Sequence, residues 1–177
     1  MAAAVALVVV AGVVRSARRQ RVWESTKTVM ISLLEDAPLN YRAHWGYGGI
    51  LFLSGKPREA ETEWRKAIHL FPEYYLPRVE LADSYWSVGL CVPAVPLYVE
   101  ALALAPEYDP ARINLVDCLL RQGRWREAER QAIIGASGGR SSVDFRRLID
   151  RARAERAGDT LLECQQTRPH DDRAIAR

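Results

Sequence analysis

The chain has 177 residues, of which 49% are hydrophobic and 27% charged, and it carries a formal net charge of +3. This length suits one domain with flanking segments, and the apolar content is enough for a buried core. The charge does not indicate a nucleic-acid partner, because residues 41–135 hold 11 basic and 12 acidic side chains and the positive surplus lies outside them.

The first segment, Ala2–Val14, is an uninterrupted run of apolar and small residues, and four arginines lie between positions 15 and 21. It is shorter than the roughly twenty residues that cross a bilayer, and it lacks the positive start and the cleavage site of a secretory signal peptide. We interpret residues 1–21 as a short membrane segment with a basic flank. A signal peptide or a soluble helix, in an exported soluble protein, is the alternative.

Residues 22–40 are predicted to form one helix of a pair. Met30, Leu33 and Leu34 follow helical spacing, and Pro38 ends the segment 34 residues before Pro72. The helix that would pair with it is missing from the pattern, because the apolar run occupies that place. We therefore expect half of a repeat here.

Residues 41–135 repeat with a period of 34 residues. A fixed period in this range is typical of a solenoid, in which short helix pairs stack to bury a continuous core. The predicted repeats are 41–74, 75–108 and 109–135. The residues in step are Gly55, Gly89 and Gly123, then Ala60, Ala94 and Ala128, then Pro38, Pro72 and Pro106.

Each repeat is predicted to contain two helices joined by a tight turn. The repeated glycine lies where the first helix ends and the chain needs a residue that tolerates positive φ. In the second helix, small residues alternate with one large residue, as in Ala94, Tyr98 and Ala101, so two helix backbones can approach closely. The sequence thus predicts an all-α protein.

The middle repeat resembles the tetratricopeptide repeat. The matching residues are Leu81, Ala82, Tyr85, Ala94, Tyr98, Ala101 and Pro106. The resemblance implies a right-handed solenoid that binds a protein or peptide in its concave groove and has no catalytic role. The sequence departs from the family at the early tryptophan position, which holds His44, Arg78 and Arg112, and in the second helix of the third repeat.

The resemblance implies that the groove is lined by the first helices. The expected groove residues are Trp45, Gly49, Phe52, Asp83, Trp86, Asp117 and Arg121. Exposed aromatic rings beside charged groups suit an extended peptide or a helix. Phe52 has the alternative role of packing between neighbouring helices. Repeats that grip a chaperone's C-terminal carboxylate use lysine and asparagine on this face. None of the expected groove residues is a lysine or an asparagine, so we do not expect that specialisation.

A second resemblance concerns the N-terminal junction. An apolar run, an arginine cluster, Trp23 and then Pro38 before the repeats is similar to the end of the transmembrane-and-tetratricopeptide class of membrane glycosyltransferases. That resemblance implies that this chain could be the repeat portion of such an enzyme, serving acceptor binding. Its repeats would then lie on the non-cytoplasmic side, whereas the positive-inside rule places the arginines in the cytoplasm. The side stays open.

The C-terminal region is predicted to contain a linker at 136–142, a capping helix at 143–157 with arginines on its outer side, and a disordered tail at 158–177. Neither the three cysteines nor the three histidines follow metal-ligand or disulfide-framework spacing. Cys118 is interpreted as a small buried hydrophobe. We find no catalytic constellation and expect no metal, cofactor or small-molecule substrate.

Overall fold

The computed structural model describes residues 26–138 and 142–166, and every element in these ranges is an α-helix. The described helices fall into two compact units, divided within α5 (Leu76–Ser87) after Ser84. The predicted membrane segment, residues 1–21, lies outside the described residues. Within them, no helix combines the length and hydropathy needed to cross a bilayer.

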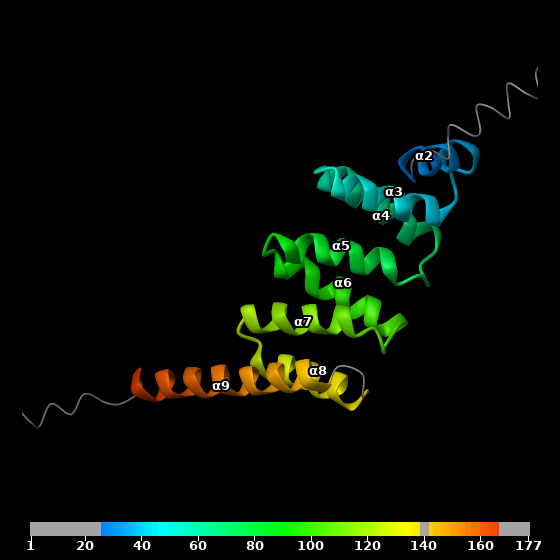
Figure 1. The fold of residues 1–177 in the computed structure, drawn as a ribbon. Coiled ribbons are helices and arrows are strands. Elements are labelled where there is room, and N and C mark those ends of the chain that lie inside the picture. The colour runs from blue at the N-terminus through cyan, green and yellow to red at the C-terminus, as the bar shows by residue number, and fades with distance from the viewer. Residues whose placement is uncertain (1–25, 139–141, 167–177) are drawn as a thin grey trace, which may run out of the picture. The chain divides into compact units, whose positions relative to one another are not determined.

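The first unit contains α2 (Thr26–Asp36), α3 (Tyr41–Leu53), α4 (Pro57–Leu70) and the larger part of α5 (Figure 1). Helix α3 packs against both α4 and α2. The fully buried residues of α4 are Ala60, Trp64 and Ala67, which are the small, large and small positions of the predicted seam. The helix pair expected for residues 41–74 is therefore present.

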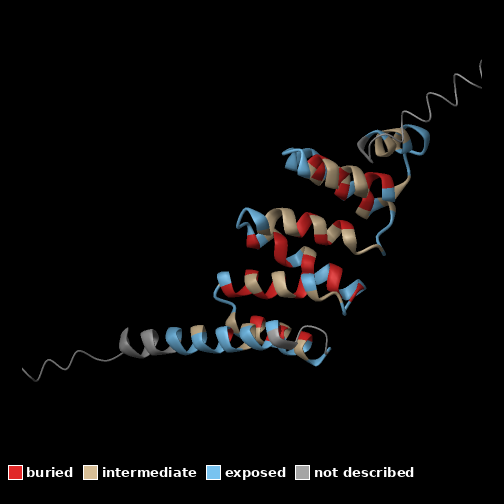
Figure 2. Ribbon diagram, viewed as in Figure 1, coloured by how far each residue is buried: buried red, intermediate tan, exposed pale blue. Residues whose placement is uncertain are grey.

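The second unit contains the end of α5, then α6 (Cys91–Leu104), α7 (Asp109–Arg121), α8 (Trp125–Ser137) and α9 (Ser142–Gln166). Successive helices from α6 to α9 pack against one another. Buried positions recur on every helix of the unit (Figure 2). They include the repeat positions Ala94, Tyr98, Ala101, Ala128 and Ala132, together with Phe145 of α9.

The three repeated glycines end the first helices as predicted. Gly55, Gly89 and Gly123 have φ values of 76°, 79° and 70°, and no other described residue has a positive φ. In each turn the residue after the glycine donates its N–H to the carbonyl five residues earlier, as Lys56 does to Leu51 at 3.0 Å. This Schellman arrangement satisfies carbonyls that the helix end would leave unpaired.

Two glycines are needed for close packing instead. A Cβ added to Gly48 would lie 2.6 Å from the indole ring of Trp64, so α3 and α4 are too close for any larger residue there. A Cβ added to Gly135 would overlap the ring of Phe145, which joins α8 to α9 in the same way. The neighbouring Gly49 has nothing within 4 Å of such a Cβ.

The cysteine interpretation was wrong. Cys91, the first residue of α6, forms a disulfide with Cys118 of α7, and their Cα atoms are 5.0 Å apart. Both side chains are buried. The separation of 27 residues does not follow the 34-residue period, so spacing along the chain gave no signal of the pair. Packing of α6 on α7 brings the two sulfurs together.

Two helix boundaries differ from the expected ones. Helix α8 continues to Ser137, into the expected linker, and α9 continues to Gln166, past the expected end at residue 157. The expected end lies just before Gly158. A glycine in a helix interior costs about 1 kcal/mol, which is small beside the combined helix propensity of the residues that follow it. Pro96 lies inside α6, on the exposed side of the helix.

Candidate functional site

The expected groove residues of the second unit meet at Asp117. The indole Nε1 of Trp86, near the end of α5, donates a hydrogen bond to Oδ2 of Asp117 at 2.8 Å. Arg121, one turn later on α7, places its Nε 2.8 Å from the same oxygen. The Asp117 side chain is 20% exposed. This carboxylate therefore fixes the orientation of one tryptophan and one arginine on the surface of the unit.

Helix α9 contributes a further residue to this group. An Nη1 atom of Arg151 lies 3.7 Å from Oδ1 of Asp117, and its Nε lies 2.7 Å from Glu155. Arg151 was not among the expected groove residues, because α9 lies outside the repeats. Oδ2 of Asp117 thus contacts Trp86 and Arg121 at hydrogen-bond distance, and Oδ1 lies within ion-pair distance of Arg151. The indole N–H of Trp86 is used, so its ring face is the part that offers contact area.

The first unit holds a second group of expected residues, on α3. The ring of Trp45 meets the ring of Tyr74 edge to face, with centroids 5.4 Å apart. The space in front of Gly49 is open. The ring centroid of Phe52, in contrast, lies 5.8 Å from that of the buried Trp64. Phe52 therefore packs between neighbouring helices, which was its alternative predicted role. Trp45 and Gly49 form the accessible part.

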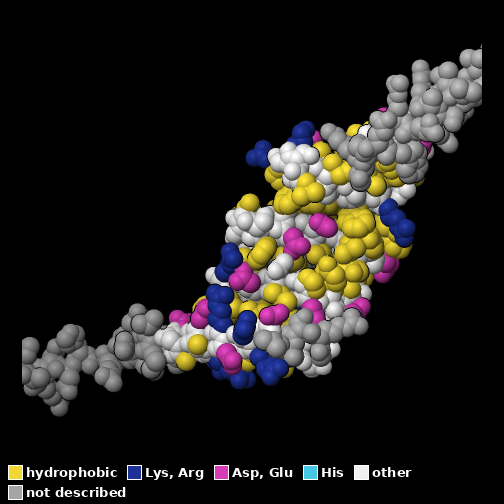
Figure 3. Space-filling model, in the orientation of Figure 1, with side chains coloured by type: hydrophobic (Ala, Val, Ile, Leu, Met, Phe, Trp, Pro, Cys, Tyr) yellow, Lys and Arg dark blue, Asp and Glu magenta, His cyan; other side chains and the backbone are white. Residues whose placement is uncertain are grey.

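Aromatic residues that sequence reasoning missed extend this surface. Tyr41 stacks on Phe71 at 4.7 Å and meets Tyr74 edge to face at 5.4 Å. Tyr74 also contacts Tyr75, with ring centroids 6.2 Å apart. Figure 3 shows hydrophobic side chains gathered over the connection between α4 and α5, to which Phe71, Tyr74 and Tyr75 belong. Paired rings of this kind add binding surface with little conformational freedom to lose.

Asp83 lies on α5 in the first unit, one helical turn after Glu80. The pKa of the Glu80 carboxyl is raised, first because the group is buried and second because the Asp83 carboxylate is close. A half-buried pair of like charges favours the approach of a cation. Among the described residues, no group of three or more histidine, cysteine or acidic side chains could hold a metal ion.

The seven expected groove residues thus lie in two groups. Trp45, Gly49, Phe52 and Asp83 belong to the first unit, and Trp86, Asp117 and Arg121 belong to the second. Within the second group the structure brings all three side chains together around one carboxylate. Each group combines an aromatic surface with charged side chains, which suits protein recognition.

Two family models, both described as tetratricopeptide repeat, match residues 14–75 and 94–132, together more than half of the chain. The chain is a tetratricopeptide repeat protein. The first match begins before the expected half repeat and includes all of it. No curated protein matches the sequence.

Several solved structures share the fold. Yeast Tom70 is 21% identical over 71% of this chain with a TM-score of 0.66, although the chain spans only 26% of Tom70. The first tetratricopeptide repeat domain of Spaghetti (RPAP3), solved bound to an HSP90 peptide, is 16% identical over 66% of the chain and 93% of that domain, with a TM-score of 0.60. MamA is 13% identical over 82% of this chain and 95% of its own, also at 0.60. These likenesses show the fold alone.

Proposed function

We propose that this tetratricopeptide repeat protein is a non-enzymatic adaptor that holds an extended segment of a partner protein against its first helices. The observation that carries the proposal is the hydrogen bond between Trp86 and Asp117, which fixes a partly exposed indole on that face. A tryptophan held in one orientation loses little entropy on binding, which is typical of interface hot spots. The RPAP3 domain, of the same fold, was solved with a peptide bound.

The chemistry of the two groups suggests what such a segment carries. An apolar side chain of the partner would lie on the ring face of Trp86 in the second unit. A basic side chain would pair with Asp83 in the first unit, where it would also relieve the unfavourable charge of Glu80. We therefore propose a preference for segments that contain both apolar and basic residues, bound at modest affinity.

Display of short peptides to the full chain tests this proposal. The wild type should enrich peptides with apolar and basic residues, and Trp86→Ala should weaken their binding by about 2 kcal/mol. Asp83→Lys should remove the basic preference but keep the apolar one. Val92→Ala, an exposed apolar residue of α6, is the control and should change nothing. Equal enrichment by the wild type, Trp86→Ala and Asp83→Lys would place the binding surface elsewhere.

We also propose that residues 2–14 tether the repeats to a membrane, supported by the apolar run and the arginines that follow it. The full chain should then sediment with membranes and resist extraction by alkali or high salt. A chain that begins near Trp23 should stay in solution and remain helical. Recovery of the intact full chain from the soluble fraction would contradict the tether.

The second candidate is the repeat portion of a membrane glycosyltransferase, which would bind acceptor proteins for the enzyme. The observation that favours it is the Cys91–Cys118 disulfide, because disulfides persist in oxidising compartments, and the resemblance implies repeats on the non-cytoplasmic side. The genomic sequence upstream distinguishes the candidates. An open frame that continues into many apolar spans supports the glycosyltransferase, and a separate start with its own ribosome site supports the adaptor.

A further inference from the structure

The outer face of α6 lacks the polar and charged side chains that the equivalent helices of the other repeats carry. Each second helix exposes a stripe of four residues at the same repeat positions, on one side of the helix. On α4 the stripe is Arg58, Thr62, Arg65 and His69, and on α8 it is Arg126, Arg130, Ile133 and Ser137. On α6 it is Val92, Pro96, Val99 and Ala103. Of these three helices, α6 alone exposes a wholly apolar stripe.

Packing inside the unit does not account for this stripe. Val92 is 78% exposed and Val99 is 50% exposed, so neither side chain contributes much to the core. Pro96 lies inside the helix, where a proline removes one backbone hydrogen bond, and its side chain is exposed as well. Exposed apolar residues that gather on one face indicate a surface that another molecule covers.

A groove runs beside the stripe, between α6 and α8. Its volume is about 250 Å³. Val95 and Val99 of α6 line one wall, Ile134 of α8 lines the other, and the buried Leu115 and Leu119 of α7 form the floor. Short turns join α6 to α7 and α7 to α8, so α6 and α8 run in the same direction. Because Ile134 is 50% exposed, the apolar surface continues from α6 across the groove onto α8.

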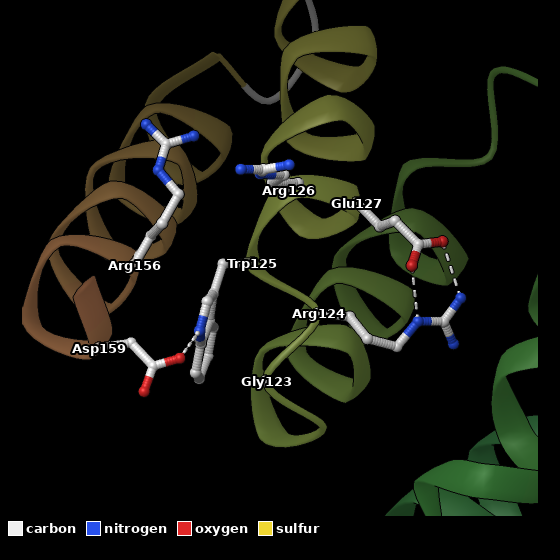
Figure 4. Close-up of a pocket in the computed structure, with 7 residues that line it drawn as sticks. All are labelled: Gly123, Arg124, Trp125, Arg126, Glu127, Arg156 and Asp159. Atoms are coloured by element: carbon white, nitrogen blue, oxygen red, sulfur yellow. Dashed lines mark hydrogen bonds and ion pairs between the residues drawn. The ribbon is translucent and has the colours of Figure 1, made fainter. Parts of the chain in front are cut away.

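The charged residues at the rim of the groove do not form a site for an ion. Nη2 of Arg124 lies 2.7 Å from Oε2 of Glu127, and Nε of Arg124 donates to Oε1 at 2.8 Å. Figure 4 shows this pair on the side of α8 that faces away from Trp125. Arg130 and Gln131 complete the rim. The groove is therefore apolar inside, with paired and scattered polar groups at its edge, which suits an apolar helix.

We infer that this groove binds α6 of a second copy of the chain, in a two-fold dimer. The stripe is a ridge, and the groove lies directly beside it, so one face carries both halves of a ridge-and-groove contact. A two-fold axis beside α6 places each stripe in the groove of the other copy, which is the self-complementary arrangement of symmetric dimers. The single charged residue of α6, Glu100, is opposite in sign to Arg130 on the rim.

The size of the face sets the strength of the dimer. Helix α6 has 14 residues. At 1.5 Å per residue it is about 21 Å long, and two helices side by side are about 20 Å wide, so the face covers about 400 Å² in projection. A corrugated face of this size buries roughly 600 Å² per copy, which is at the lower end for specific interfaces. The dissociation constant should therefore lie in the micromolar range.

The dimer does not depend on the proposed peptide groove. Trp86 and Asp117 lie on α5 and α7 and line no part of the groove between α6 and α8. A contact through α6 and α8 therefore leaves the Trp86 group to its own partner. Two copies of that group in one dimer would bind a partner that carries two such segments with added avidity.

The test is sedimentation velocity of the full chain in a mild non-ionic detergent, at concentrations from about 1 to about 100 μM, which bracket the expected dissociation constant. The wild type should pass from monomer to dimer. Pro96→Arg should raise the dissociation constant at least about tenfold, because it places a charge in the apolar contact. Thr62→Arg is the matched control, since it makes the same change at the same repeat position of α4, and it should leave the dimer unchanged. Far-UV circular dichroism should show that both variants keep their helices.

Cross-linking between copies locates the contact. Benzoylphenylalanine in place of Val99, in an equal mixture of ¹⁴N- and ¹⁵N-labelled chains, should give mixed-isotope cross-links to peptides from α6 or α8. A wild type that stays monomeric at the highest concentration would overturn the inference. A dimer that Pro96→Arg leaves intact would do the same, as would mixed-isotope cross-links confined to helices other than α6 and α8 or to the apolar run at residues 2–14.

Discussion

The imidazole of His44 donates from Nε2 to the carbonyl oxygen of Pro38 at 2.9 Å, which ties the start of α3 to the turn that precedes it. Arg78 makes the same bond to Pro72 at 2.7 Å, and Arg112 bonds to Pro106. The three donors are 34 residues apart, as are the three prolines. The residues that depart from the family's early tryptophan therefore share one task, which is to satisfy the carbonyl of the proline that closes the preceding repeat.

His44 and Arg112 also reach the second helix of their own repeat. Nδ1 of His44 lies 2.6 Å from Glu63 on α4, and Arg112 donates to Gln131 on α8 at 2.8 Å. Both partners are 19 residues later in the chain. The equivalent of Glu63 and Gln131 in the middle repeat is Leu97, which cannot accept a hydrogen bond. The first repeat is the one in which this contact includes an acidic group.

Stability at low pH should depend on Glu63. Burial raises the pKa of its carboxyl, but hydrogen bonds from Lys66 and His44 outweigh burial and hold that pKa below its ordinary value. Because the folded-state pKa is depressed, the stabilisation is present above the unfolded pKa of about 4.3 and is lost as the pH falls through the folded value. Glu63→Gln should remove this part of the pH dependence and lower the stability at pH 7.

The measurement is urea unfolding of the wild type and Glu63→Gln between pH 7 and pH 3. The two free energies of unfolding should differ most at neutral pH and converge in acid. Glu73→Gln, at an exposed position of the same unit, is the control and should follow the wild type throughout. A constant difference between wild type and Glu63→Gln over the whole range would contradict the linkage.

Two adjacent glycines of α3 should respond in opposite ways to the same substitution. Gly48→Ala places a methyl group against the indole of Trp64 and should cost about 1 to 3 kcal/mol through overpacking. Gly49→Ala meets open space and should stabilise the helix by up to about 1 kcal/mol. Thermal unfolding measures both. The pair is matched in chemistry and position, so equal changes would show that α3 and α4 do not approach as described.

The indole of Trp64 provides a further check on that contact. Its Nε1 is buried and has no hydrogen-bond partner among the residues that the structure describes. Trp64→Phe removes this unsatisfied donor and makes room beside Gly48, so we expect it to reduce the cost of Gly48→Ala in the double variant. The coupling energy, from a double-mutant cycle, should be at least about 0.5 kcal/mol. Additive effects would contradict direct contact between the two residues.

Reduction of the Cys91–Cys118 disulfide should destabilise the second unit. The bond closes a loop of 27 residues, for which chain entropy alone gives about 3 to 4 kcal/mol. Alkylation after unfolding without reductant should label one cysteine of the full chain, and all three after reduction. Cys118→Ser should lower the melting temperature as reductant does, and Cys164→Ser should not. Labelling of three cysteines without reductant would contradict the pair.

The period of the sequence was enough to predict the helix pairs, the glycine turns and the buried alanines, because each depends on contacts inside one repeat. Residues outside the period could not be found in this way. Arg151 reaches Asp117 from a helix that belongs to no repeat, and Cys91 meets Cys118 at a spacing unrelated to 34. His44, Arg78 and Arg112 were in step with the prolines. Their hydrogen bonds could still not be predicted, because every residue has a backbone carbonyl and the acceptor therefore leaves no pattern in the sequence.

The contribution of Glu80 to folding stability should change with pH in the opposite direction to that of Glu63. Burial and the nearby Asp83 raise the pKa of the Glu80 carboxyl, so the folded state binds its proton more tightly than the unfolded chain. Its contribution is favourable in acid and is lost as the pH rises through the folded value. Glu80→Gln keeps the shape of the neutral carboxyl and should raise the stability at pH 7, with little effect near pH 4.

A partner peptide with a basic residue should add a second effect. If that residue pairs with Asp83, binding should lower the pKa of Glu80, and the wild type should gain more affinity between pH 5 and pH 7 than Glu80→Gln does. Isothermal titration at the two pH values measures this difference, and an equal pH response of both proteins would place the basic residue away from α5.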